Sequence, residues 1–298
     1  MSQMFSIIEI ETAMRRDVEQ LGSKPKFWFE YEGEKWLFKE ARENTGEDWA
    51  EKIASELASA LSLPTHRVEL ADYEGRRGCA VRSFLKKGQV LVHGNEVLGG
   101  FITGYDKEKQ RGQSEHTFAN IVRVLEAAFV EDRARFKASS WMAGYLVLDA
   151  LVGNTDRHHE NWGMILEPRD GEDGKLDWVG GIAPTFDHAS SLGRELLDEA
   201  RERRLKNQTI EAYIRKARGG IFGSSEDRHG LSPIGVAEMM AEVYPDFYKP
   251  WQERVGDLDS VYIESLVARV PDARMSRIGR AFTLAFLSKT RNLIAEAL

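Results

Sequence analysis

The sequence has few of the features that mark secreted or membrane proteins. It contains a single cysteine, Cys79, among 298 residues, which excludes a disulfide framework within the chain and favours a reducing compartment. No apolar run approaches the roughly 18 residues that a bilayer-spanning helix requires. Residues 1–11 carry charges and no apolar core of signal-peptide length. We therefore expect a cytoplasmic protein that makes no membrane contact.

Positive charge is also scarce. The chain has 41 Lys and Arg residues against 48 Asp and Glu residues, a net charge of −7. This balance argues against direct nucleic-acid binding through a general basic surface. Residues 201–206 and 215–218 are locally basic, and we interpret them as solvated helix faces or as contacts for an acidic substrate. The length suffices for one large domain or for two lobes.

One polar motif stands out in the middle of the chain. Asp156 is followed five residues later by Asn161, and a second carboxylate, Asp187, comes after an intervening hairpin pattern. Phosphoryl transfer requires one carboxylate to accept a hydroxyl proton, and an Asn and an Asp to hold Mg²⁺ against the phosphates of ATP. Asp156 fits the first role, and Asn161 and Asp187 fit the second. The motif predicts an ATP-dependent phosphotransferase.

The flanking segments agree with that interpretation. Residues 141–152 are rich in apolar side chains and predict a buried helix, which Gly153 ends. Two short apolar strands follow, joined by the polar segment 168–174, which contains Gly and Pro and reads as a hairpin tip. Asn161 would enter the first strand and Asp187 would leave the hairpin at the same end. Ligands of one metal ion have to converge in this way.

Two other interpretations of the motif were weighed. Each polar residue alone could be an ordinary turn residue or a surface ion pair. His158 and His159 could instead be zinc ligands, with His188 as the third histidine. Adjacent histidines point in different directions, however, and a structural zinc site needs closed tetrahedral coordination. We therefore favour the phosphotransferase.

A nucleotide-binding lysine and a carboxylate that orients it are also expected. Lys39 ends a short aromatic strand over residues 35–39, and a helix over residues 48–61 follows. Trp49, Ile53, Leu57 and Leu61 recur every four residues on one face of that helix. Glu56 lies beside this stripe and could hold Lys39; the alternative pairs Glu56 with Lys52 as a solvated surface pair.

A phosphate-binding loop is expected ahead of Lys39. Gly22 and Ser23 lie in a small-residue turn that enters an alternating aromatic strand. Backbone N–H groups at such a turn can contact ATP phosphates. The following strand should pair with the Lys39 strand across a turn at residues 32–34. With only one glycine, the loop is a weak pattern by itself.

Two longer strings resemble one kinase family. Residues 148–163 (LDALVGNTDRHHENWG) and 183–193 (APTFDHASSLG) are similar to the catalytic and metal-binding loops of the HipA-like serine/threonine kinases. Their fold is shared with the phosphatidylinositol 3/4-kinases. The resemblance extends from about Gly22 to the C-terminal helices. It implies an α+β, bilobal protein-kinase-like fold, with a mixed, β-rich N-terminal lobe over residues 1–84 and a mainly helical C-terminal lobe over residues 85–298.

The resemblance also assigns roles to individual residues. It makes Lys39 the nucleotide lysine, Asp156 the general base, and Asn161 and Asp187 the magnesium ligands. Residues 79–84 fall where the interlobe hinge contacts adenine. From the local patterns and the resemblance together, we expect the following residues at the nucleotide: Gly22, Ser23, Lys39, Glu56, Val81, Phe84 and His158.

For function, the resemblance implies an ATP:protein serine/threonine phosphotransferase, in some members the toxin of a toxin–antitoxin system. Aminoacyl-tRNA synthetases are among the protein substrates of the family, and many members have a small antitoxin partner. The chain departs from the longer members because only about twenty residues precede the expected phosphate loop. A lipid or small-molecule kinase of related fold, and a catalytically inactive binding module, are the alternatives.

Overall fold

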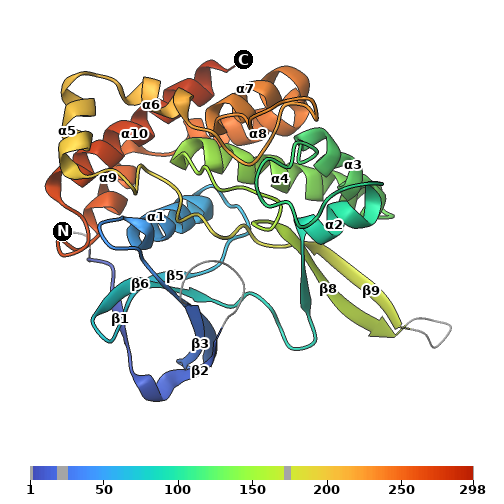
Figure 1. Ribbon diagram of the computed structural model, residues 1–298, viewed down its shortest axis with the longest axis horizontal. Coiled ribbons are helices and arrows are strands. Elements are labelled where there is room, and N and C mark those ends of the chain that lie inside the picture. Colours follow the sequence, from blue (N-terminus) through green and yellow to red (C-terminus); the bar gives the residue numbers. More distant parts are fainter. Residues whose placement is uncertain (1–2, 19–25, 171–175, 298) are drawn as a thin grey trace.

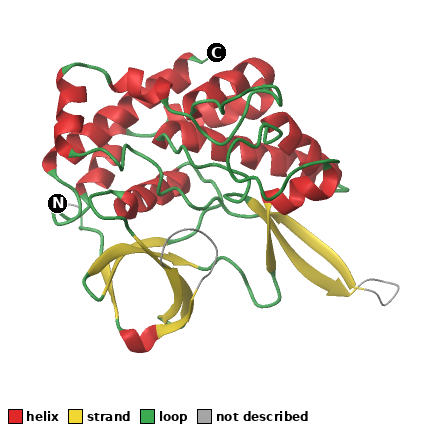
Figure 2. Ribbon diagram, in the orientation of Figure 1, coloured by secondary structure: helices red, strands yellow, loops and turns green. Residues whose placement is uncertain are grey.

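A computed structural model describes residues 3–18, 26–170 and 176–297 of the chain. It has a curled sheet of six strands with one helix against it, and a second part that is mainly helical (Figure 1). Figure 2 shows this separation, with the strands gathered below the layer of helices. The α+β fold expected from the sequence is confirmed. The six strands are β1 (Ile7–Ile10), β2 (Arg15–Val18), β3 (Lys26–Tyr31), β4 (Glu34–Glu40), β5 (Val68–Tyr73) and β6 (Arg76–Arg82).

The sheet has the order β1-β5-β6-β4-β3-β2. The expected hairpin between the two aromatic strands is present, since β3 and β4 pair antiparallel and close with Tyr31 opposite Glu34. Its turn places Glu32 at φ 52° and Gly33 at φ 73°. Positive φ at both central residues is the backbone of a tight hairpin turn whose twist matches that of the strands.

Helix α1 (Glu47–Ala60) lies between the sheet and the helical part (Figure 1). The predicted stripe is confirmed, because Trp49, Ile53, Leu57 and Leu61 are all at most 2% exposed. Their rings and methyl groups join the large core that continues into the helical part. Both faces of α1 are covered, which is why Glu51 is also buried.

The helical part surrounds α4 (Asp132–Val152), whose second half forms the predicted buried helix. A three-stranded sheet projects beside it, formed by β7 (Val90–His93), β8 (Gly163–Asp170) and β9 (Leu176–Ile182) (Figure 1). Residues 168–170, predicted to belong to the hairpin tip, are part of β8, and residues 171–175 lie outside the described residues. The remaining helices are α2 (Gly94–Phe101), α3 (Phe118–Ala128), α5 (Asp198–Lys206), α6 (Ile210–Lys216), α7 (Pro233–Val243), α8 (Pro245–Gly256), α9 (Ser260–Ala268) and α10 (Arg277–Glu296), and a short 3₁₀ turn, η1 (Thr12–Met14), links β1 and β2.

Residues 85–104 are rich in glycine, a composition that favours irregular structure, but the observed structure is regular. This segment holds β7 and α2. Its glycines mislead because at least one of them is required by close packing. A Cβ at Gly94, the first residue of α2, would lie 2.2 Å from the indole ring of Trp162. Within the described part of the chain, no helix combines the length and the apolar character needed to cross a bilayer.

Candidate active site

The loop that carries Asp156 begins at a left-handed helix end. Gly153 caps α4 with φ +68°, and a Cβ there would lie 2.4 Å from the ring of Phe286. Glycine is therefore required both by the backbone and by the packing. Asn154 then accepts a hydrogen bond from the backbone N–H of Asp156 at 3.1 Å. The Asp156 side chain is 56% exposed, so an incoming substrate can reach it.

Arg157 organises this loop from inside the protein. Its side chain is 2% exposed and donates to both carboxylate oxygens of Asp149, at 2.7 and 2.9 Å. The same guanidinium donates to the backbone carbonyls of Asn161 and Phe186 and to the hydroxyl of Thr185. Because Phe186 precedes Asp187, one cation ties the two loops together. Charged bidentate contacts of this kind are strong and directional.

Asn161 has one side-chain atom left for a ligand. Its Nδ2 donates to the backbone carbonyl of Asp156 at 2.7 Å, which directs the amide and leaves Oδ1 as the remaining acceptor. His158 lies beside the same carboxylate, with Nε2 3.9 Å from Asp156 Oδ1. Its Nδ1 accepts from the backbone N–H of Glu160 at 3.2 Å, so the neutral ring carries its proton on Nε2, toward Asp156.

Lys39 and Asp187 meet directly. Lys39 Nζ lies 3.0 Å from Asp187 Oδ1, across 148 positions of sequence. The Asp187 side chain is 35% exposed and that of Lys39 is 16% exposed, so the pair faces an opening. Asp187 has φ +63°, a left-handed conformation that Asp and Asn adopt more readily than most residues.

The ionisation of this pair follows from its surroundings. Burial alone would lower the pKa of Lys39, but the carboxylates of Asp187 and Glu51 outweigh it and raise that pKa. Burial alone would raise the pKa of Asp187, but the Lys39 ammonium lowers it. Both groups are therefore charged at neutral pH, and Asp187 is an anionic ligand for a cation.

The predicted partner of Lys39 requires a correction. Glu56 does not contact Lys39; its Oε1 lies 2.7 Å from Lys52 Nζ, the alternative that the sequence left open. The α1 carboxylate that acts on Lys39 is Glu51. Five residues of helix turn the side chain by about 140° around the axis, so Glu51 and Glu56 face different neighbours.

Two predicted adenine contacts lie close to the Lys39–Asp187 pair. In the β4–β6 ladder, Lys39 is opposite Cys79 and Leu37 is opposite Val81, which places all of them on one face of the sheet. The ring of Phe84 stacks on that of Phe186 with centroids 5.9 Å apart. Together they provide an apolar surface next to Lys39. Gly22 and Ser23 lie outside the described residues, so their predicted place at the phosphates is untested.

The donor set suits magnesium better than zinc. The described residues contain no cluster of three or more His, Cys, Asp and Glu side chains able to hold a metal ion. Mg²⁺ is usually held by one or two carboxylates together with substrate phosphates and water. The carboxylate of Asp187 and Oδ1 of Asn161 fit that demand.

Sequence reasoning missed Arg157, Asp149 and Glu51 as site residues. Arg157 lies within the motif that runs from Asp156 to Asn161. Asp149 is a charged residue inside an apolar segment, and such a residue indicates that the fold contains a buried ion pair. Glu51 gave no signal, because its burial depends on segments far along the chain.

His116 holds the segment that contains Gly220 against the loop of Asp156. This ring is 1% exposed, its Nδ1–H donates to the carbonyl of Gly220 at 2.8 Å, and its Nε2 accepts from Trp162 Nε1–H at 3.0 Å. A Cβ at Gly220 would lie 2.7 Å from the carbonyl oxygen of Arg157, which shows how closely the segment approaches. Burial lowers the pKa of His116 to about 3.

Acid should therefore destabilise the fold through His116. An unfolded histidine has a pKa of about 6.5, so between pH 6.5 and pH 3 the unfolded chain binds one more proton than the folded chain. The free energy of unfolding then falls as pH is lowered through this window. From pH 7 to pH 5 we expect His116 alone to remove about 2 kcal/mol. Urea unfolding at both pH values, for wild type and His116→Gln, measures this, and equal pH dependence in the two proteins would contradict it.

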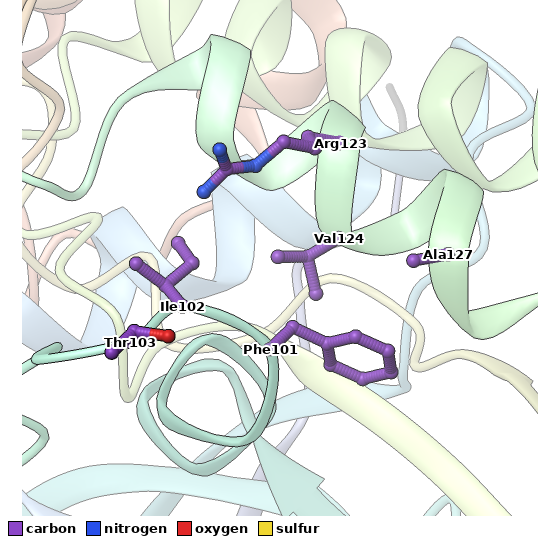
Figure 3. A pocket seen from close by; sticks show the side chains of 6 residues that line it. All are labelled: Phe101, Ile102, Thr103, Arg123, Val124 and Ala127. Carbon is purple, nitrogen blue, oxygen red and sulfur yellow. The ribbon is translucent and has the colours of Figure 1, made fainter.

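A separate hollow of about 490 Å³ lies between α2 and α3 (Figure 3). Arg123 and Val124 of α3 face Phe101 and Ile102 across it. None of the residues considered above lines this hollow. It is therefore separate from the candidate active site.

The sheet, the central α4 and the paired loops define a protein of the kinase fold. Residues 20–251 match the HipA-like C-terminal domain family, and the chain belongs to that family. Among solved structures it is similar to the Helicobacter pylori proinflammatory kinase CtkA, with a TM-score of 0.75 and 18% identity over 98% of this chain and 96% of that one. It is also similar to Shewanella oneidensis HipA, solved in a toxin–antitoxin complex with HipB and operator DNA. That match has a TM-score of 0.60 and 14% identity, over 96% of this chain and 66% of HipA. The sequence matches none of the curated proteins with which it was compared.

Proposed function

We propose that this protein transfers the γ-phosphate of Mg-ATP to a serine or threonine hydroxyl of a protein substrate. The observation that carries the proposal is the Arg157 guanidinium, which ties the loop of Asp156 and Asn161 to the loop of Asp187. Asp187 in turn holds Lys39 of the sheet at 3.0 Å. A base, two metal ligands and a phosphate-binding lysine are thereby assembled from both parts of the fold, as phosphoryl transfer requires.

Each residue has a distinct task in this proposal. Asp156, half exposed at the surface, accepts the proton of the substrate hydroxyl as the new O–P bond forms, while the bond from the γ-phosphorus to the β,γ-bridging oxygen of ATP breaks and ADP leaves. Lys39 leaves its contact with Asp187 and donates to the ATP phosphates. Asn161 Oδ1 and the Asp187 carboxylate would hold Mg²⁺, which would neutralise phosphate charge when bound. His158 would lie next to the reacting groups through its position beside Asp156.

The nucleotide base has its own proposed surface. Val81 and Phe84 would contact adenine, because they lie at the end of β6 next to the Lys39 strand. Phe186 would close this surface through its stacking on Phe84. Gly22 and Ser23 are proposed to contact the phosphates. Glu51, in place of Glu56, is proposed to orient Lys39.

The substrate and the partner rest on family likeness alone. HipA of Shewanella oneidensis was solved with HipB and DNA, and we propose that this chain has a small antitoxin-like partner. An aminoacyl-tRNA synthetase is one candidate for the protein substrate. A shared fold transfers such identities poorly, so each needs its own experiment.

Nucleotide binding can be tested by thermal unfolding. ATP with Mg²⁺ should stabilise wild type by about 2.7 kcal/mol at a ligand concentration a hundred times Kd. Asp187→Asn should lose most of this Mg²⁺-dependent shift, because the amide carries no charge for the metal. Asn tolerates the positive φ at this position, but loss of the ion pair with Lys39 should lower the apo melting temperature, so the shift is measured for each protein from its own apo state. Full stabilisation of the variant by Mg-ATP would refute the assignment of Asp187.

A further inference from the structure

Three polar side chains are buried together behind the Lys39–Asp187 pair. Glu51 Oε1 lies 3.7 Å from His66 Nε2 and 3.7 Å from His188 Nδ1, and the three side chains are at most 1% exposed. The two imidazole rings are nearly parallel, at 18°, with centroids 6.3 Å apart. Among the described residues, neither oxygen of Glu51 has a hydrogen-bond partner, and neither has Nδ1 of His188; the carboxylate and the rings face each other slightly beyond hydrogen-bond distance.

The backbone fixes these rings relative to each other. Thr65, next to His66, forms an isolated parallel bridge with Thr185. The backbone N–H of Thr185 also donates to the carbonyl of Pro64 at 2.9 Å. The segment after α1 and the segment that leads to Asp187 therefore move together. Glu51 approaches them from α1, which lies between the sheet and the helical part (Figure 1).

The orientation of the His188 proton follows from its neighbours. Arg157 Nη2 donates to Thr185 Oγ1 at 3.0 Å, and His188 Nε2 lies 2.8 Å from the same oxygen. The Thr185 hydroxyl keeps its own proton and needs an acceptor, which His188 Nε2 supplies. Nδ1 then carries the ring proton and directs it at Glu51. The opposite tautomer would leave that hydroxyl without this acceptor and would set a lone pair against the Glu51 carboxylate.

Building on the kinase function proposed above, we propose that His188 is a positioning residue whose Nδ1–H holds Glu51 in place to orient Lys39. The contacts form one polar chain, defined as Asp149, Arg157, Thr185, His188 and Glu51. This chain joins the loop of Asp156 to the lysine of the sheet. His66 Nε2 lies at the same distance, 3.7 Å, from the same oxygen of Glu51.

The electrostatics of Glu51 agree with this role. Burial alone would raise its pKa, but the Lys39 ammonium and then the two rings lower the pKa well below its usual range. Glu51 is therefore an anion in the interior, and its charge has to be compensated by the Lys39 ammonium and by the polar rings that face it at 3.7 Å. When the His188 N–H is lost, we expect the carboxylate to move and Lys39 to lose its orientation toward the phosphates.

Two substitutions separate the contacts of His188. The amide of Asn reaches the position of Nδ1 and keeps a donor toward Glu51, whereas Gln reaches the position of Nε2 and keeps the contact with Thr185. We expect His188→Gln to raise KM for ATP about tenfold and His188→Asn to stay within about threefold of wild type. In a Glu51→Gln background, His188→Gln should have no further effect on KM, because both changes break one contact.

A merely structural role predicts something different. The two His188 variants would then lose activity in step with their melting temperatures, and the effects of Glu51→Gln and His188→Gln would add. Either result would overturn the proposal.

A spectroscopic measurement is independent of activity. The ¹⁵N chemical shifts of the His188 ring should show that Nδ1 is protonated. The His188 signal is assigned as the one that is missing from the spectrum of His188→Asn. An Nε2–H tautomer with bare Nδ1 overturns the proposal even when the wild type transfers phosphate. Absence of transfer by wild type would instead count against the kinase function, and the ring signal would still decide the contact between His188 and Glu51.

Discussion

Asp156→Asn should abolish phosphoryl transfer while leaving nucleotide binding intact. The amide cannot accept the proton of the substrate hydroxyl, and loss of a general base costs about 10²–10⁴-fold in rate. The change is isosteric, and the Asp156 side chain is 56% exposed, so the fold should tolerate it. Transfer from γ-labelled ATP and the thermal shift with Mg-ATP are measured on the same preparation.

A matched control for this variant lies on the projecting hairpin. Asp170→Asn makes the same chemical change at an exposed position at the end of β8. It should transfer phosphate at the wild-type rate. If the Asp156 variant also transfers phosphate at the wild-type rate, Asp156 is not the base.

Overproduction in cells gives a second readout. If the protein acts as a toxin, we expect a growth defect with wild type and none with Asp156→Asn.

Arg157→Met should cause the largest loss of stability of any single change considered. It leaves the Asp149 carboxylate, 2% exposed, without its cation, and breaking a buried ion pair costs about 3–5 kcal/mol. The carbonyls of Asn161 and Phe186 lose a donor at the same time. The free energy of unfolding, measured in urea, should fall accordingly, and transfer activity should disappear.

A double variant separates the buried charge from the loss of packing. Arg157→Met with Asp149→Leu removes both charges, and well-packed apolar replacements of a buried pair often recover stability. We expect the double variant to be more stable than Arg157→Met and still inactive, because the two loops are no longer tied together. A double variant no more stable than Arg157→Met would show that the unpaired Asp149 carboxylate is not the source of the loss.

The elements that the sequence predicted well are those with local patterns. The four-residue stripe of α1, the hairpin of β3 and β4, and the end of α4 at Gly153 each follow from spacing or from the conformational freedom of glycine. The family resemblance added the kinase fold, which no local pattern specifies. β7 and α2 are not evident from the sequence, because glycine is frequent in this segment and the packing of Gly94 against Trp162 cannot be read from a local pattern.

The residues of the candidate site also differ in whether a local sequence pattern can locate them. Asp156, Asn161 and Asp187 lie within two short motifs, and a resemblance can locate them one by one. The choice between Glu51 and Glu56 depends on which face of α1 meets the sheet and on His66 and His188, which approach from other segments. A sequence pattern shows that a helix is amphipathic, but not which charged residue the rest of the fold will bury.

Transfer of label from γ-labelled ATP tests the central claim most directly. Purified wild type would be incubated with Mg-ATP and a host lysate, and mass spectrometry would identify the labelled species. We predict label on serine or threonine of a protein, and none with Asp156→Asn. Label on a lipid or small molecule would contradict the proposed substrate class, and no label on any species would contradict the phosphotransferase itself.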